Sequence, residues 1–102
     1  MVTIQLPIAN EDGMAALIMC RDTEMPAVPR VGESINSREV QSVSWSESIR
    51  NPEQWVASVR VEPMSARSWE KCKETAADLR RGGWEELSDR AHRIQVELGM
   101  EA

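Results

Sequence analysis

The sequence predicts an α+β fold, a small antiparallel barrel-like sheet of about four or five strands followed by a C-terminal helical hairpin. Two observations predict it. Before Pro63, apolar residues recur at every second position, the period of a strand with one buried face. After Ser65 they recur at every third or fourth position, the period of an amphipathic helix. We therefore expect one domain over residues 1–102, β-rich at 1–63 and helical at 64–102.

The first predicted strand covers residues 2–8, with an apolar face made of Val2, Ile4, Leu6 and Ile8. Pro7 has no backbone N–H, so the far end of this strand is expected to be unpaired on one side. Asp12 and Gly13 then predict a hairpin turn. Residues 14–21 are apolar all round and fit either a central strand or a short helix. The preceding turn favours the strand.

The next segment predicts a loop and two more strands. Pro26 and Pro29 mark a loop that enters a bent strand near residues 34–35. Residues 39–46 alternate, with Val43 and Trp45 on one face and serines on the other. Residues 55–62 alternate in the same way, after a polar connection at 49–53. The short connection predicts that these two strands pair antiparallel, and we expect Pro63 to close the sheet.

Three short stretches in this region match a known pattern: residues 29–35 (PRVGESI), 40–45 (VQSVSW) and 56–61 (VASVRV). They resemble small, largely uncharacterised bacterial and phage proteins, in which P-R-x-G-[DE]-x-[IV] enters an SH3-like β-barrel and V-x-x-V-x-[WY] forms its next strand. The resemblance covers residues 29–62, under half of the chain. It implies a compact barrel or strongly twisted sheet, and it carries no catalytic residues.

The C-terminal third predicts two helices. The first has an apolar stripe made of Trp69, Cys72, Ala76 and Leu79, begins at a cap on Ser65 or Ser68, and ends at Gly82 and Gly83. The second has a stripe made of Trp84, Leu87, Ala91, Ile94 and Leu98, with Glu85 and Glu86 in its first turn. We expect the two stripes to cover one face of the sheet; the alternatives are that they pack on each other or on a second copy of the chain.

Composition and charge exclude several classes of protein. A net charge of -5 argues against a nucleic-acid binder that works by neutralising phosphates. No apolar run reaches the roughly 20 residues of a membrane span, and no basic leader precedes an apolar stretch, so we expect no membrane association and a cytoplasmic location. The four tryptophans are expected to anchor the core. Cys20 and Cys72 are expected to be reduced, buried thiols.

No constellation of residues predicts chemistry. Glu85, Asp89 and His92 share a helix face and have a spacing that could hold a divalent cation, but a solvated helix face has the same pattern. His92 alone could serve as a general base in a small hydrolase, yet no nucleophile partner can be identified for it. The glycines form no phosphate-binding motif. We therefore predict a protein that is not an enzyme and has no cofactor and no metal.

The candidate site is a surface for a partner. Apolar residues in predicted loops, flanked by arginines, would form a patch with a polar rim: Met25, Val28, Val31 and Ile49 with Arg30, Arg38 and Arg50. The alternative is that the apolar side chains plug the ends of the barrel. Trp45 and Trp55 could flank the patch, although burial in the core is favoured for both.

The sequence thus predicts a non-enzymatic interaction or assembly module, with a phage or mobile element as the expected source. Its partner would be another protein or a second copy of the chain. The alternative is a nucleic-acid-associated regulator that uses Arg30, Arg38, Arg50 and Arg60 on the barrel, which the acidic composition opposes.

Overall fold

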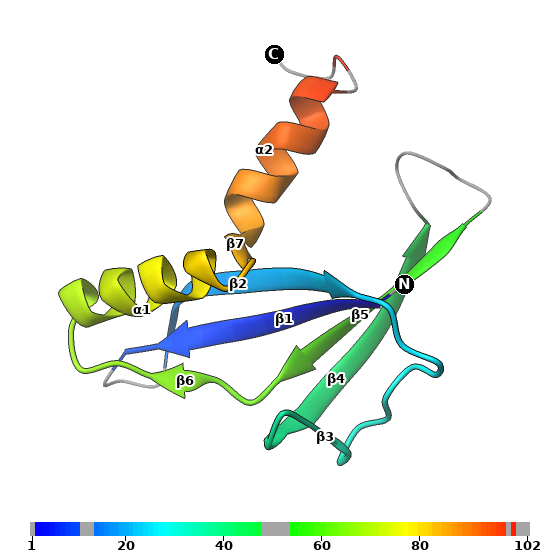
Figure 1. The fold of residues 1–102 in the computed structure, drawn as a ribbon, viewed down its shortest axis with the longest axis horizontal. Helices are drawn as coiled ribbons and strands as arrows, with labels where there is room; N and C mark the ends of the chain where they lie inside the picture. Colours follow the sequence, from blue (N-terminus) through cyan, green and yellow to red (C-terminus); the bar gives the residue numbers. More distant parts are fainter. Residues whose placement is uncertain (1, 11–13, 48–53, 98, 100–102) are drawn as a thin grey trace.

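A curled sheet and two helices make up the residues that the computed structural model describes, which are 2–10, 14–47, 54–97 and 99 (Figure 1). In chain order the elements are β1 (Val2–Ala9), β2 (Ala15–Thr23), β3 (Ser34–Ile35), β4 (Arg38–Glu47), β5 (Trp55–Val61), β6 (Met64–Ser65), α1 (Trp69–Arg81), β7 (Glu85–Glu86) and α2 (Leu87–Glu97). The α+β class is confirmed.

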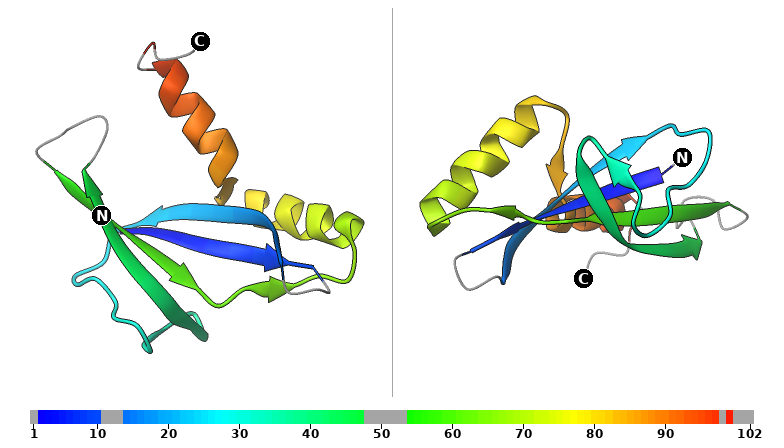
Figure 2. Two further views of the ribbon diagram at one scale, coloured as in Figure 1. Left: turned by 180° about the vertical axis from the view of Figure 1, so that it is seen from behind. Right: turned by 90° about the horizontal axis from the view of Figure 1, so that it is seen from below.

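The strands of the described residues form one seven-stranded sheet with the order β3-β4-β5-β1-β2-β7, and β6 pairs with β1. The sheet curls into half a barrel (Figure 2). It has more strands than the sequence analysis expected, because the two-residue strands β6 and β7 were not predicted, whereas β3 is the bent strand expected near residues 34–35. It is also mixed rather than antiparallel, because β1 runs parallel to β5 and to β6.

Strand β1 lies at the centre of the sheet, between β5 and β2. The predicted alternation is present, but both faces of β1 are covered: Thr3 is 7% exposed and Pro7 is buried, like the apolar residues beside them. The expectation of a half-buried strand was therefore wrong. Alternation alone could not show this, since it is the packing of distant segments that buries the second face.

The far end of β1 was expected to be unpaired on one side because of Pro7, but it is paired on both: Ile8 and Ala9 face β2 on one side and β6 on the other. On the side of β1 away from β2, the register partners stop at Gln5, which faces Arg60, and resume at Ile8, which faces Met64. Pro7 lies in this gap, where no N–H is needed. Because β6 takes up the pairing again, Pro63 interrupts the sheet and does not close it.

The two predicted hairpins are present. Residues 15–23 form strand β2, antiparallel to β1, so the strand interpretation of residues 14–21 holds and the helix is excluded. The turn assigned to Asp12 and Gly13 lies outside the described residues. Strands β4 and β5 pair antiparallel, with Val43 opposite Val59 and a bulge between Val40 and Ser42. The connection between β4 and β5 at residues 48–53 is also outside the described part of the chain.

The core lies on one face of the sheet and has two adjoining clusters. One cluster joins β1, β4 and β5, and consists of Val2, Ile4, Leu6, Val40, Ala57, Val59 and Val61. The other joins β1, β2 and α1, and consists of Ile8, Met19, Ala66, Cys72 and Ala76. Leu79 and Trp84 pack against both clusters, so they connect the helical part to the whole sheet.

Helix α1 forms as the sequence predicts. The Ser68 side chain caps its start by accepting a hydrogen bond from the N–H of Lys71. Gly82 and Gly83 end the helix, and Gly83 has a φ of 93°, which favours glycine. Of the predicted stripe, Cys72 and Ala76 are buried against the sheet. Trp69 is 53% exposed, because it lies in the first turn of α1, before the part of the helix that packs on the sheet.

The second helix begins at Leu87 and not at Trp84. Glu85 and Glu86 form the short strand β7, paired with Cys20 and Met19 of β2. Helix α1 lies along the sheet, whereas α2 rises away from it (Figure 1). The expected helical hairpin is therefore a helix–strand–helix unit. No helix formed by the described residues is long and apolar enough to cross a membrane.

Candidate interaction surface

Strands β4 and β5 extend past the beginning of β1 and carry two exposed tryptophans. Val2, the first residue of β1, faces Ala57 of β5, and Ala57 in turn faces Trp45 of β4. Trp55 lies further out, opposite Glu47. We call this outer end of the β4–β5 ladder, residues 45–47 and 55–56, the tryptophan arm (Figure 1).

The two indole side chains lie on the same face of the arm. Trp55 is the diagonal cross-strand neighbour of Trp45, an arrangement that brings Cα atoms to about 7–8 Å. The face is the one that carries the core residues Ala57 and Val59 further along β5. The apolar face of the sheet thus continues outward onto the arm, beyond the segments that cover it elsewhere.

Both tryptophans are exposed, Trp45 by 56% and Trp55 by 60%. The expectation that they are buried in the core was wrong. Their face was assigned correctly, but neither tryptophan packs against the core cluster of β1, β4 and β5, and neither helix covers that end of the sheet (Figure 2). Large aromatic side chains that stay exposed on the continuation of a core face are typical of contact surfaces, because burying them releases much free energy.

The outer edge of β4 is open next to the arm. Strand β3 pairs only with Arg38 and Glu39. The next residue, Val40, donates its N–H to the carbonyl of Glu33 at 2.7 Å and accepts from the N–H of Gly32 at 2.9 Å. Beyond it, no strand among the described residues pairs with this edge. We call residues 41–46 the open edge.

The predicted patch residues lie near the other end of β4. Met25 and Val28 are half-buried and pack against the core cluster of β1, β4 and β5, as the plug alternative expects. They also line a shallow depression of about 400 Å³ with Ile35. Val31 is 63% exposed. Ile49 lies outside the described residues, so a role for these side chains in binding stays a prediction.

The arginines of the expected rim do not surround one patch. The guanidinium of Arg38 is half-buried and donates to the carbonyls of Glu62 and Pro63 at 3.5 and 3.4 Å, which ties β4 to the end of β5. Arg60 donates two hydrogen bonds to the side chain of Gln5. Arg30 is exposed, and Arg50 lies outside the described residues.

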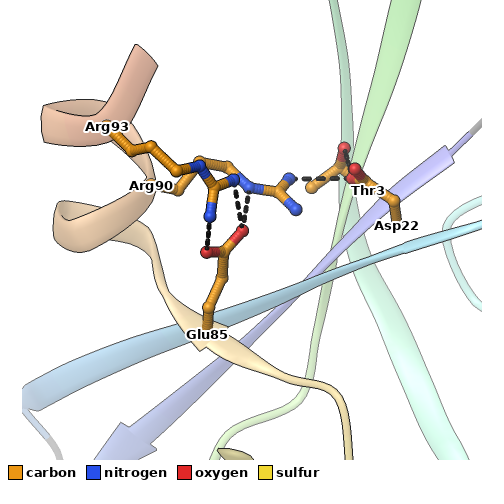
Figure 3. Close-up of polar contacts among 5 residues, drawn as sticks. All are labelled: Thr3, Asp22, Glu85, Arg90 and Arg93. Atoms are coloured by element: carbon orange, nitrogen blue, oxygen red, sulfur yellow. Dashed lines mark hydrogen bonds and ion pairs between the residues drawn. The ribbon is translucent and has the colours of Figure 1, made fainter. Parts of the chain in front are cut away.

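An ion-pair network holds the base of α2 against the sheet (Figure 3). Arg90 contacts Glu85 at 2.7 Å and Asp22 at 2.8 Å, and Asp22 also accepts from the hydroxyl of Thr3. Hydrogen bonds from Arg93 and then Arg90 lower the pKa of Glu85, although burial acts in the opposite direction. Burial would lower the pKa of Arg90, but its hydrogen bonds to Asp22 and Glu85 outweigh that effect and raise it.

Glu85, Asp89 and His92 do not share one helix face as predicted, because Glu85 lies in β7 and the other two lie in α2. Glu85 belongs to β7 and its carboxylate is occupied by the two arginines. Asp89 lies 3.8 Å from Arg80. Across residues 2–10, 14–47, 54–97 and 99, no three His, Cys, Asp or Glu side chains are grouped so that they could hold a metal ion.

The two cysteines are free and fully buried, as expected. Cys20 lies under the base of α2, where burial is the main cause that raises the pKa of its thiol. A buried thiol with a raised pKa is a poor nucleophile. The geometry around Cys20 and Cys72 therefore indicates packing, not chemistry.

A groove of about 410 Å³ separates α2 from β2 and is lined by residues 16–18 of β2 and by Glu86, Leu87, Ser88 and Ala91. It exists because only the base of α2 contacts the sheet. The predicted stripe of α2 is consequently less covered than expected: Leu87 and Ile94 are half-buried, and Ala91 is exposed.

Sequence reasoning missed the tryptophan arm and the open edge as candidate surfaces. A usable signal was present in residues 41–46 (QSVSWS), a strand segment without charge or proline, which is unusual for an edge strand. The position of β4 in the sheet, however, depends on pairings between distant segments. Comparison with protein-family models, with curated proteins and with solved structures gave no match. The resemblance of residues 29–62 to SH3-like barrels therefore stays a prediction.

Proposed function

We propose that this protein is a non-enzymatic protein-interaction module whose contact surface is the tryptophan arm. The observation that carries the proposal is the pair of exposed indoles, Trp45 and Trp55, on the uncovered continuation of the core face. Tryptophan is the residue type most enriched among interface positions that dominate binding energy. A module of this kind needs an apolar contact surface and no reactive groups.

The energetics favour a partner over solvent. A tryptophan presents about 250 Å² when fully exposed, so the two indoles together leave on the order of 290 Å² in water. At about 25 cal/mol per Å², burying this area gives about 7 kcal/mol before the costs of association. This gain is large beside the 5–15 kcal/mol that typically stabilise a domain. The proposal therefore places the main binding energy in these two side chains.

Capture from extracts of the host organism tests the proposal. The bait is the full chain, compared with the double variant Trp45→Ser/Trp55→Ser. The matched control is Trp69→Ser, because Trp69 has a similar exposure of 53% but lies at the start of α1. Circular dichroism and thermal unfolding confirm that each bait is folded.

We expect the wild type and Trp69→Ser to capture the same protein, whether another protein or a second copy of the chain, and the double variant to lose it at least tenfold. Equal capture by the double variant would refute the proposal, as would a folded wild type that captures nothing. Loss with Trp69→Ser but not with the double variant would move the surface to α1 and refute it too.

A further inference from the structure

The open edge of β4 lacks the protection that edge strands normally have. Exposed backbone N–H and C=O groups along an edge can pair with another strand, and natural proteins block such pairing with charges, prolines or very short strands. Residues 41–46 contain no charged residue and no proline. At the opposite edge of the sheet, β7 pairs with Met19 and Cys20 of β2 and brings Glu85 and Glu86 there, and α2 follows directly in the chain.

The side chains of the open edge divide cleanly between two faces. Ser42, Ser44 and Ser46 lie on one face, where all three are exposed. Val43 and Trp45 lie on the other, opposite Val59 and Ala57 of β5. A strand that pairs antiparallel with this edge must match an apolar face to Val43 and Trp45 and a small polar face to the serines. The open edge itself meets both requirements.

We infer that β4 pairs antiparallel with β4 of a second copy, so that the two sheets join across a two-fold axis at Ser44. This inference rests on the proposed function, and it names the partner of the same surface. With the axis at Ser44, Trp45 of each copy lies opposite Val43 of the other, and the two Trp45 side chains are diagonal neighbours. The tryptophans of both arms then form one continuous apolar row across the junction.

The area available fits a small dimer. The four tryptophans of two copies expose on the order of 580 Å², taking about 250 Å² for each full side chain. A specific interface needs about 1,000 Å² or more. The remaining ~420 Å² would come from the other ten residues of the two open edges, or about 42 Å² from each. Since these residues are mostly exposed, this amount is available.

Charge selects the edge as the place where two copies can meet. Each chain carries a net charge of -5, so two copies repel one another over most of their surface. The open edge carries no charged side chain, either on the face of the serines or on the face of Val43 and Trp45. An interface of this size with general repulsion around it predicts dissociation in the micromolar range.

A charge swap at Ser44 tests the pairing. The two-fold axis places Ser44 opposite itself, so Ser44→Lys alone sets two ammonium groups against each other, and Ser44→Glu alone sets two carboxylates. An equal mixture of the two variants sets opposite charges together. Ser44 is exposed and each variant should fold, which circular dichroism verifies. The control is Ser88→Lys, which changes the charge equally but lies in the groove between α2 and β2.

Sedimentation equilibrium of the full chain over a concentration series gives the readout. We expect wild type and Ser88→Lys to approach twice the chain mass of 11.5 kDa. Each Ser44 variant should dissociate at least tenfold more readily, and the mixture should recover the dimer. A monomeric wild type, dimers in both separate variants, or a mixture that fails to recover would each overturn the inference. Loss of the dimer in Ser88→Lys alone would overturn it in favour of the groove.

The failure of this inference can be told apart from failure of the proposed function. If the wild type is monomeric but Trp45→Ser/Trp55→Ser still loses a captured host protein, the arm binds a different protein and only the second copy is excluded. If neither dimer nor captured protein is found, both proposals fail.

Discussion

Removing the Arg90 guanidinium should loosen α2 from the sheet. The Arg90 side chain is only 16% exposed, and its Nε donates to Glu85 while its Nη1 donates to Asp22 (Figure 3). These contacts join α2 to β7 and β2 at the one place where the helix meets the sheet. Arg90→Gln keeps most of the side-chain stem and removes both ion pairs, so it isolates their contribution.

The expected cost is about 2 kcal/mol. A hydrogen bond to a charged group contributes about 1.5–3 kcal/mol when it is well shielded. Here the side chains of Glu85 and Asp22 are 26% and 37% exposed, and each keeps a second donor, Arg93 or Thr3. We therefore take about 1 kcal/mol for each contact, which corresponds to a fall in melting temperature of about 10 °C if the whole chain unfolds together.

Urea unfolding and amide hydrogen exchange measure the effect. We expect exchange to rise first in α2 and much less in β1, because the lost contacts hold only the helix base. Arg93→Gln is the control: the Arg93 side chain is 52% exposed, so its ion pair with Glu85 is largely screened by solvent and its removal should cost less than about 1 kcal/mol. Equal exchange in α2 of Arg90→Gln and the wild type would refute the assignment of the network as the anchor.

The stability lost in Arg90→Gln should depend on pH. Hydrogen bonds from Arg93 and Arg90 hold the pKa of Glu85 below its ordinary value of 4.5. A lowered pKa in the folded state means that the stabilisation is complete above the unfolded pKa and is lost as pH falls through the folded pKa. The difference between wild type and Arg90→Gln should therefore be full near pH 7 and shrink towards about pH 3. A difference that does not change with pH would show that the stem of Arg90, not its charge, anchors α2.

Three further predictions follow from burial and backbone geometry. Cys20 and Cys72 are fully buried, and so Ellman's reagent should label neither thiol in the native protein and both in guanidinium chloride. Met19→Ala should lower the free energy of unfolding by about 2–5 kcal/mol in urea titrations, because Met19 is 0% exposed between β1 and α1. Gly83→Ala should cost about 1–2 kcal/mol despite empty space around its Cβ, because φ is 93°, whereas Gly82→Ala, at a φ of -89°, should cost less in the same assay.

Local sequence patterns correctly predicted where the main strands and the first helix lie, but not how the strands pair or how deeply they are buried. The alternation of residues 2–8 correctly predicts β1, and the stripe of α1 correctly predicts burial of Cys72 and Ala76. The parallel pairing of β1 with β5 joins segments more than fifty residues apart. No spacing of apolar residues within either strand encodes that pairing, which is why a mixed sheet was not expected and why the second covered face of β1 went unnoticed.

At the candidate site, too, the sequence predicted the face on which residues lie but not whether they are buried. Alternation places Val43 and Trp45 on one face, which the register of β4 with β5 confirms. Whether a residue on that face is buried depends on what packs over it: Ala57 belongs to the core cluster, whereas Trp45 and Trp55 are exposed. Because tryptophan is large and apolar, we expected Trp45 and Trp55 in the core. Neither helix covers the tryptophan arm, so both side chains are exposed (Figure 2). Trp84, which follows the Gly83 turn onto the same face as the core, is the tryptophan that does pack against both clusters.

The two edges of the sheet explain why association should occur at β4 in particular. At the β2 edge, Glu85 and Glu86 pair with the strand, and arginines from both helices neutralise them, so a new strand would have to displace ion pairs as well as β7. At the β4 edge, β3 is the one described strand that would compete, and it is confined to the far end. A second strand at residues 41–46 would displace no strand of the described residues and would add contacts to Trp45, which is 56% exposed, and this gain offsets the cost of association. The exposed arm and the unprotected edge share Trp45 and therefore form one surface: the arm lies beyond the start of β1, and the edge is open because β3 pairs only with Arg38 and Glu39.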